Sequence, residues 1–249
     1  MSSRLLVVLC VIAVIVALLV GFAVLFGTQV VMVYSTKRMM ANSPEVAMVP
    51  QALTLTPLES PAGRRVAYFG YEFALPWSDV EEELGGRAVR VISESGITIS
   101  MEDPAFPGGP LSETVFSDPG PSAQTAALVG SRGYELYEDV LMATPDQLSW
   151  TLSRRESVRA CWLVILKMAI LAETRGVSAV YTFQDRNWRG FQIGQPGQDA
   201  RVVLGLFGQG GEEVWLTFEV PYSSRGSLTQ DSVNCVITTL QRVPMTNEP

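Results

Sequence analysis

The chain has 249 residues, no histidine, three cysteines and a formal net charge of −7 at neutral pH. The lack of histidine excludes Ser-His-Asp and Cys-His catalysis and histidine-ligated zinc, and three cysteines without a CxxC pair exclude a thiolate metal cage. An acidic surface repels phosphate backbones, so nucleic acid is not an expected partner. We therefore expect no metal and no other cofactor.

The first 38 residues form a hydrophobic N-terminal segment. Leu5 to Phe26 contains neither charge nor proline, and as a helix it spans about 33 Å, close to the roughly 30 Å of a bilayer core. A cleaved secretory signal is the alternative, but its apolar region is usually only about 7 to 15 residues and ends at small residues. The pattern predicts an uncleaved single-pass anchor over 1–38, with the lipid bilayer as its partner through Leu5–Phe26.

Basic residues lie on both sides of this run, with Arg4 before it and Lys37 and Arg38 after it. The positive-inside rule therefore does not decide the orientation. The very short N-terminal flank favours a cytoplasmic N-terminus. In a bacterium this orientation places the rest of the chain outside the inner membrane, in the periplasm.

Residues 39–63 carry four prolines among small and polar residues, without a sustained helical or strand period. This composition is typical of a tether, so a proline-rich tether is predicted over 39–63. Beyond it we expect one soluble α+β domain over 64–243 and a disordered tail over 244–249.

The domain opens with an aromatic stretch, YFGYEFALPW, from Tyr68 to Trp77. Bulky side chains alternate with small or polar ones, which predicts one strand whose buried face carries Phe69, Tyr71, Phe73 and Leu75. Tyr68 points to the opposite face, and Trp77 follows the proline that ends the strand. These two aromatic residues, beside Glu72, are candidates for contact with a ligand or partner.

Three segments follow before the helices. The spacing Ser78-Asp-Val-Glu81 fits a capping box and predicts a short helix through Leu84. Two β-type runs, 88–93 and 97–101, flank Glu94-Ser95-Gly96 and predict a hairpin. Residues 103–121 hold five prolines and predict a long irregular loop, of a length that is usually functional or mobile.

Helices are predicted over 134–142 and 154–175, the second between a capping box, Ser153-Arg-Arg-Glu156, and Gly176. Thr144-Pro-Asp-Gln147 predicts a short linking helix. Lys167 lies at the edge of the apolar face of the long helix. A Schiff-base lysine or a Ser-Lys base would need such a residue, but no nucleophile elbow is near, so we expect Lys167 to snorkel to solvent.

Four strand-like runs, 177–184, 189–194, 201–207 and 213–220, predict a meander, and an amphipathic helix is predicted over about 230–243. The turn Gly208–Gly211 lacks the GK[ST] ending of a phosphate loop and precedes a strand, which favours a hairpin turn. Cys161 and Cys235 lie on apolar helix faces, which favours buried free thiols over a disulfide. The element order predicts an α+β fold, an antiparallel-sheet α/β sandwich after the transmembrane helix.

The segment from Arg186 to Phe191 is the best candidate binding site. Arg186, Trp188 and Arg189 would contact an anionic ligand or a partner segment through guanidinium groups and an aromatic face. The alternative, which we favour, is a tight hairpin whose Arg189 covers a neighbouring ring. A catalytic alternative pairs the carboxylates of Glu72 and Glu81, with the 103–121 loop as a lid.

Three stretches, YFGYEFALPW, YEDVLMATPDQLSW…SRRESVRACWLVILKMAIL and RNWRGFQIG…VVLGLF…EVWLTFEV, together resemble an uncharacterised family of bacterial proteins with one N-terminal anchor. The similarity covers most of residues 66–243. More distantly, the order of the elements is similar to PsbP-like domains, although the helices between hairpin and meander are longer here. The second resemblance implies an α-β-α sandwich that acts as an accessory or binding module without catalytic residues.

These observations predict a membrane-tethered, non-catalytic domain at the bacterial cell envelope that binds a protein or a small ligand. Two alternatives stay open. One is a membrane-bound hydrolase that uses paired carboxylates, and the other is a structural subunit of a membrane complex.

Overall fold

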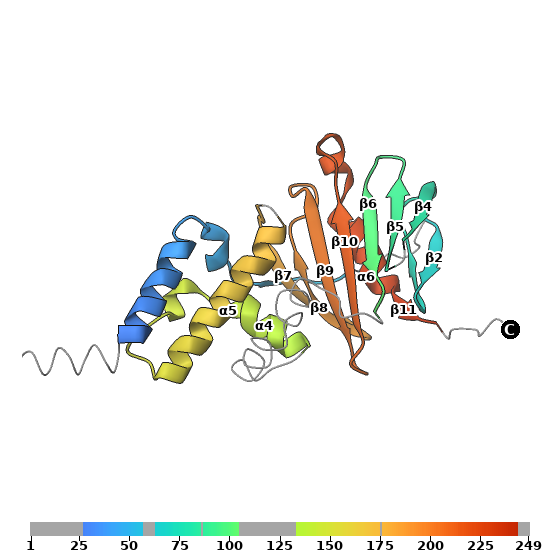
Figure 1. The fold of residues 1–249 in the computed structure, drawn as a ribbon. Coiled ribbons are helices and arrows are strands. Elements are labelled where there is room, and N and C mark those ends of the chain that lie inside the picture. Colours follow the sequence, from blue (N-terminus) through green and yellow to red (C-terminus); the bar gives the residue numbers. More distant parts are fainter. Residues whose placement is uncertain (1–26, 57–62, 86, 105–132, 175, 244–249) are drawn as a thin grey trace, which may run out of the picture.

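The computed structural model describes residues 27–56, 63–85, 87–104, 133–174 and 176–243 (Figure 1). The predicted span Leu5–Phe26, the loop from residue 105 onward and the tail over 244–249 lie outside these residues. Within the described ranges, no helix has the length and apolar character needed to cross a membrane.

A large mixed sheet forms the centre of the fold, with the strand order β1-β7-β8-β9-β10-β6-β5-β4. Its strand pairs are antiparallel except for the parallel pair of β1 with β7. The strands are β1 (Gln51–Ala52), β4 (Val80–Leu84), β5 (Ala88–Ser93), β6 (Thr98–Glu102), β7 (Val180–Gln184), β8 (Trp188–Ile193), β9 (Arg201–Gly208) and β10 (Glu213–Glu219). The predicted α+β class with an antiparallel sheet is confirmed.

One face of this sheet packs against a small sheet and a helix. The small sheet has the order β11-β3-β2, and the helix α6 (Gln230–Thr239) follows the 3-10 turn η3 (Tyr222–Ser227). Its strands are β2 (Arg65–Tyr68), β3 (Tyr71–Ala74) and β11 (Gln241–Arg242). Together they bury a core that includes Phe73, Leu204, Phe218 and Val236.

The other face carries a helical layer over β8, β9 and β10. This layer consists of residues 27–40, η1 (Pro44–Ala47), α4 (Tyr134–Met142), η2 (Pro145–Gln147) and α5 (Arg154–Glu173). Tyr137 of α4 packs on the rings of Phe191, Phe207 and Trp215. The layer lies toward the β7 end of the sheet in Figure 1. It leaves the same face of β6, β5 and β4 less covered, and residues on that face, such as Ser100 and Arg90, are half-buried or exposed.

The aromatic stretch forms two strands, so the prediction of a single strand is wrong. Tyr68 and Tyr71 face each other across a two-residue turn, in which Phe69 has a φ of 53° and Gly70 a φ of 79°. Two consecutive positive φ angles match the right-handed twist of hairpin strands, and glycine adopts them readily. Phe69 therefore leaves the predicted buried face, whereas Tyr71, Phe73 and Leu75 are buried as expected.

The predicted helix from Ser78 through Leu84 is also wrong, because Val80–Leu84 is the edge strand β4. It pairs with β5 from Val80 opposite Ser93 to Leu84 opposite Val89. A single helical turn makes few hydrogen bonds for the residues that it orders, so the ladder with β5 is the more stable choice. The glutamates that suggested a helix start instead give an exposed, charged edge strand.

Residues 39–56 pack onto the domain and do not form an extended tether. Met40 and Val46 are buried in the core of the helical layer, and β1 pairs with β7. Within the helical segment 27–40, the buried positions are Gln29, Val33, Thr36 and Met40, which is the spacing of one helix face. Pro44 is compatible with this packing because it occupies the first position of the turn η1, where a missing backbone N–H costs no hydrogen bond.

The remaining predicted elements are close to their expected bounds. The hairpin β5–β6, the helices α4 and α5 and the meander β7–β10 are confirmed. The capping box of Ser153 and Glu156 is present at the start of α5, and Cys161 and Cys235 are buried free thiols. The last helix is shorter than predicted, because Gln241 and Arg242 pair with β3 instead.

Candidate functional site

The predicted binding segment forms the turn between β7 and β8 and the start of β8, beside a cavity of about 270 Å³. Trp188 is buried, and its indole Nε1 donates a hydrogen bond to the carbonyl oxygen of Leu240 (2.9 Å). Arg186 is exposed in the turn. The structure therefore separates these two residues, because Trp188 stabilises the core and only Arg186 faces solvent.

Arg189 is bound to α4. Its guanidinium carbon lies 4.4 Å from the centre of the Tyr134 ring, and Nη2 lies 2.5 Å from Oε1 of Glu135. Hydrogen bonds from its own backbone amide and from Arg189 lower the pKa of Glu135. The guanidinium group of Arg189, which a ligand would contact, is therefore already engaged within the molecule. The favoured alternative, in which Arg189 covers a neighbouring ring, agrees with the structure.

The other three predicted contact residues lie in or next to the small sheet. Tyr68 and Trp77 are half-buried against the core beneath that sheet, and burial raises the pKa of the Tyr68 hydroxyl. Glu72 accepts hydrogen bonds from Nη1 of Arg65 (3.1 Å) and Nε2 of Gln241 (3.2 Å). None of these three residues lines the cavity beside the turn between β7 and β8 or a larger cavity at the C-terminal end of α5.

The proposed carboxylate pair is split between two sheets. Glu72 belongs to β3 of the small sheet and Glu81 to β4 of the large one. The hydrogen bond from Arg65 lowers the pKa of Glu72, whereas a general acid needs a raised pKa. Glu72 is therefore poorly suited to the acid role in a two-carboxylate mechanism.

Lys167 is fully buried, so the prediction that it snorkels to solvent is wrong. Its Nζ donates hydrogen bonds to the carbonyl oxygens of Met48 (2.5 Å) and Ala143 (2.8 Å). These two residues are the C-caps of η1 and α4. One ammonium group thus satisfies carbonyls at the ends of two helical turns, where a cation is favourable.

The error over Lys167 has a physical cause in the N-terminal segment. A helical wheel of α5 places Lys167 at the edge of the apolar face, and η1 packs against α5 on the side that the sequence assigned to solvent. Desolvation lowers the pKa of Lys167 to about 8. Because the amine is fully buried, we assign it a clamping role between α5, α4 and η1.

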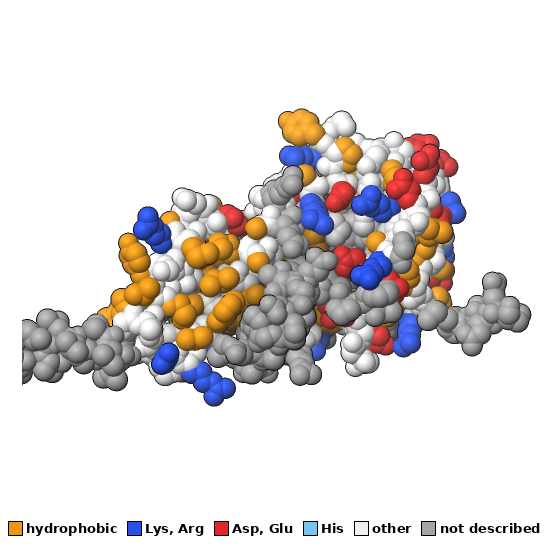
Figure 2. All heavy atoms as spheres, in the orientation of Figure 1, with side chains coloured by type: hydrophobic (Ala, Val, Ile, Leu, Met, Phe, Trp, Pro, Cys, Tyr) orange, Lys and Arg blue, Asp and Glu red, His pale blue; other side chains and the backbone are white. Residues whose placement is uncertain are grey.

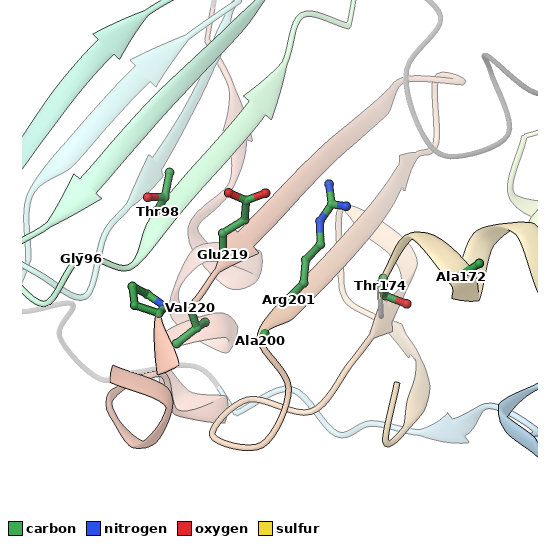
Figure 3. A pocket seen from close by; sticks show the side chains of 9 residues that line it. Gly96, Thr98, Ala172, Thr174, Ala200, Arg201, Glu219 and Val220 are labelled. Carbon is green, nitrogen blue, oxygen red and sulfur yellow. The ribbon is translucent and has the colours of Figure 1, made fainter. Parts of the chain in front are cut away.

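The larger cavity is a cleft of about 720 Å³ between the C-terminal end of α5 and the sheet. Figure 3 shows the side chains of Thr98, Glu219 and Arg201 projecting to the same side from adjacent strands. Glu219 of β10 lies opposite both Arg201 of β9 and Thr98 of β6 in the strand register. A carboxylate thus stands between a guanidinium and a hydroxyl on the floor of the cleft.

Small side chains form the walls of this cleft. Ala172 and Thr174 come from the end of α5, and Ala200, Val220 and Pro221 from the strand ends. Gly96 closes one side with a φ of +76°, and a Cβ there would lie 3.3 Å from Cγ of Pro221. The walls therefore leave room for an occupant, and the charges of the floor can face it.

This cleft was not predicted from the sequence, although part of the signal is present there. The predicted strands 201–207 and 213–220 with a turn at Gly208–Gly211 form a hairpin whose register pairs Arg201 with Glu219. Opposite charges on directly paired positions indicate a polar patch on one face. The contribution of Thr98 and of α5 required the tertiary structure, because these residues are far away in the chain.

The lining of the cleft offers polar recognition groups. Among its residues, Glu219 is the one carboxylate and Arg201 the one cation, and the lining includes no cysteine, serine or lysine. Over the described residues, no group of three or more acidic or cysteine side chains is placed to hold a metal ion. The described cleft is therefore suited to binding through ion pairs and hydrogen bonds.

No protein-family model, curated protein or solved structure matches the chain.

Proposed function

We propose that the chain is a membrane-tethered, non-catalytic binding domain of the bacterial cell envelope, and that the cleft between α5 and β9–β10 is its binding site. The observation that carries this proposal is the row of Arg201, Glu219 and Thr98 on the floor of a cleft of about 720 Å³. A volume of this size is in the range of about 300 to 1,000 Å³ typical of ligand pockets.

The floor of the cleft indicates the class of its occupant. Arg201 would bind an anionic group as a bidentate fork, and Glu219 would bind a cationic group beside it. The two residues are directly paired on neighbouring strands, and the strands lie about 5 Å apart in the hydrogen-bonding direction. A peptide segment with an acidic and a basic group at similar spacing would satisfy both, so we propose a protein partner.

Binding is favoured over catalysis by the state of the reactive groups in the described chain. Lys167 is buried between two carbonyls, the thiols of Cys161 and Cys235 are buried, and Glu72 is paired with Arg65. Burial raises the pKa of both thiols, which disfavours the nucleophilic thiolate. The order of the elements, which is similar to that of PsbP-like domains, implies the same role, because such domains act as accessory or binding modules.

Photo-crosslinking in native membranes tests the proposal. A benzoyl-phenylalanine in place of Thr98 should give a discrete adduct, and the same group in place of Leu84, on the exposed edge strand, should not. The double variant Arg201→Glu with Glu219→Arg keeps the net charge and the cross-strand pair but exchanges the two charges. It should abolish the adduct while leaving thermal unfolding close to that of the wild type.

Two results would contradict this function. Equal adducts from the Thr98 and Leu84 positions would mean that the cleft is not selective. Turnover of a substrate by the purified full chain, lost on Glu219→Gln, would mean that the cleft is catalytic. Location has a separate test, because alkaline phosphatase fused after Pro249 should be active if the domain lies outside the inner membrane.

A further inference from the structure

The loop before α5 lies beside the point at which the predicted membrane span ends. The apolar run ends at Phe26, and the described helical segment starts at Gly27. In the first turn of that segment, Nε2 of Gln29 donates a hydrogen bond to the carbonyl oxygen of Leu152 (3.4 Å). Figure 1 shows the start of α5 at the same end of the helical layer as the start of the helical segment 27–40, drawn in blue.

This loop exposes apolar side chains next to basic ones. Trp150 is 45% exposed and Leu152 is 36% exposed, and Arg154 and Arg155 follow them on the surface. Tryptophan and leucine with adjacent arginines are the residues that occupy the interface of an anionic bilayer. In Figure 2, apolar side chains gather over the helical layer, whereas acidic ones gather toward the β4–β5 end of the sheet.

The loop has a defined conformation. The hydroxyls of Ser149 and Thr151 lie 2.7 Å apart, and Oγ of Ser157 donates to the carbonyl oxygen of Ser149 (2.9 Å). The capping box of Ser153 and Glu156 fixes the first turn of α5. The exposed side chains of the loop are therefore presented by an ordered backbone.

The two arginines are not explained by the stability of α5. They occupy the first two positions of the helix, where the macrodipole favours acidic residues and disfavours cations. A surface that contacts anionic headgroups would account for two cations at this place. Contact with a second copy across a twofold axis is less favourable, because it would bring four guanidinium groups together.

We infer that residues 149–155, which are the loop before α5 and the first two residues of the helix, form a membrane-interface anchor. In it, Trp150 and Leu152 enter the headgroup layer, and Arg154 and Arg155 bind lipid phosphates. This inference rests on the proposed membrane tether and adds a second contact to it. Its consequence is that the helical layer lies directly on the bilayer.

Fluorescence quenching by lipids with brominated acyl chains tests the anchor. The full chain is reconstituted in vesicles of phosphatidylcholine and phosphatidylglycerol, and wild type is compared with Trp150→Phe. The variant should lose the largest single share of the bromolipid quenching. Trp77→Phe, which removes a half-buried tryptophan near the small sheet, should leave the quenching unchanged.

A second variant tests the role of charge. Arg154→Gln with Arg155→Gln should reduce the quenching of Trp150 in vesicles that contain phosphatidylglycerol, and high salt should reduce it in the wild type. Equal quenching in wild type and Trp150→Phe would overturn the anchor. Loss of crosslinked dimers on Trp150→Phe, without loss of quenching, would also overturn it, because the loop would then contact a second copy.

Extraction of the membranes with alkaline carbonate separates this inference from the proposed function. Release of the wild-type chain would refute the membrane tether itself. Retention of the chain without quenching of Trp150 would refute only the interface anchor.

Discussion

Replacement of Lys167 by methionine tests the clamp between α5, α4 and η1. Methionine is similar in length but uncharged, so Lys167→Met removes a buried ammonium and leaves the carbonyls of Met48 and Ala143 without this donor. An unsatisfied buried polar group costs about 1 to 3 kcal/mol. Removal of the buried charge offsets this loss, because lowering a lysine pKa from 10.5 to about 8 corresponds to a cost of about 3 kcal/mol for the protonated form.

At pH 7 the two effects of Lys167→Met oppose each other, so the variant should lose no more than about 3 kcal/mol of unfolding free energy. The pH dependence separates them. Between about pH 8 and pH 10.5, the unfolded chain keeps the lysine proton and the folded chain has released it. The unfolded state then binds more protons, so the Lys167 contribution to the free energy of unfolding rises with pH.

The wild type should therefore gain about 2 to 3 kcal/mol over Lys167→Met between pH 7 and pH 10. For a chain of this size, this is a change of about 4 to 12 °C in the difference between the two melting temperatures. Thermal unfolding in detergent, followed by tryptophan fluorescence, measures it, and Lys37→Met removes an exposed lysine as a control. A difference between wild type and Lys167→Met that stays constant from pH 7 to pH 10 would refute the buried, charged clamp.

Two further substitutions test the packing of the helical layer. Gly205→Ala would place a Cβ 2.8 Å from Cη2 of Trp215. It should therefore lower the free energy of unfolding in urea by about 1 to 3 kcal/mol. Gly226→Ala is the control and should be close to neutral, because a Cβ there would have nothing within 4 Å. Arg189→Ala should cost only about 1 kcal/mol, because its pair with Glu135 is half exposed, and a loss above about 3 kcal/mol would show that the arginine is a core element.

Local signals predicted most of the fold correctly. The start of α5 follows from Ser153 and Glu156, because the side chain of each residue accepts a hydrogen bond from the backbone amide of the other, within four residues. The hairpins of the meander follow from short strands between turns of glycine and polar residues. In each case the deciding interactions lie within a few residues along the chain, so a single sequence contains them.

The errors arise where contacts outside the local sequence pattern decide the structure. Ser78–Glu81 has the spacing of a capping box, but pairing with β5 decides in favour of a strand. Lys167 would face solvent if η1 did not pack over it, and η1 lies more than one hundred residues earlier in the chain. The same distance hid the cleft, because Thr98 and the end of α5 meet only in the folded chain. A helical wheel or a cap pattern contains none of these contacts.

The helix α5 connects the two proposed sites. Its first turn follows the loop with Trp150 and Leu152, and its C-terminal end contributes Ala172 of the last turn and the C-cap residue Thr174 to the cleft. A helix of 20 residues is about 30 Å long. If the loop lies on the bilayer, the cleft is therefore at most about 30 Å above the bilayer surface, whatever the tilt of α5. Its partner must then present a peptide segment within that distance, which favours a membrane protein or a protein docked on the membrane.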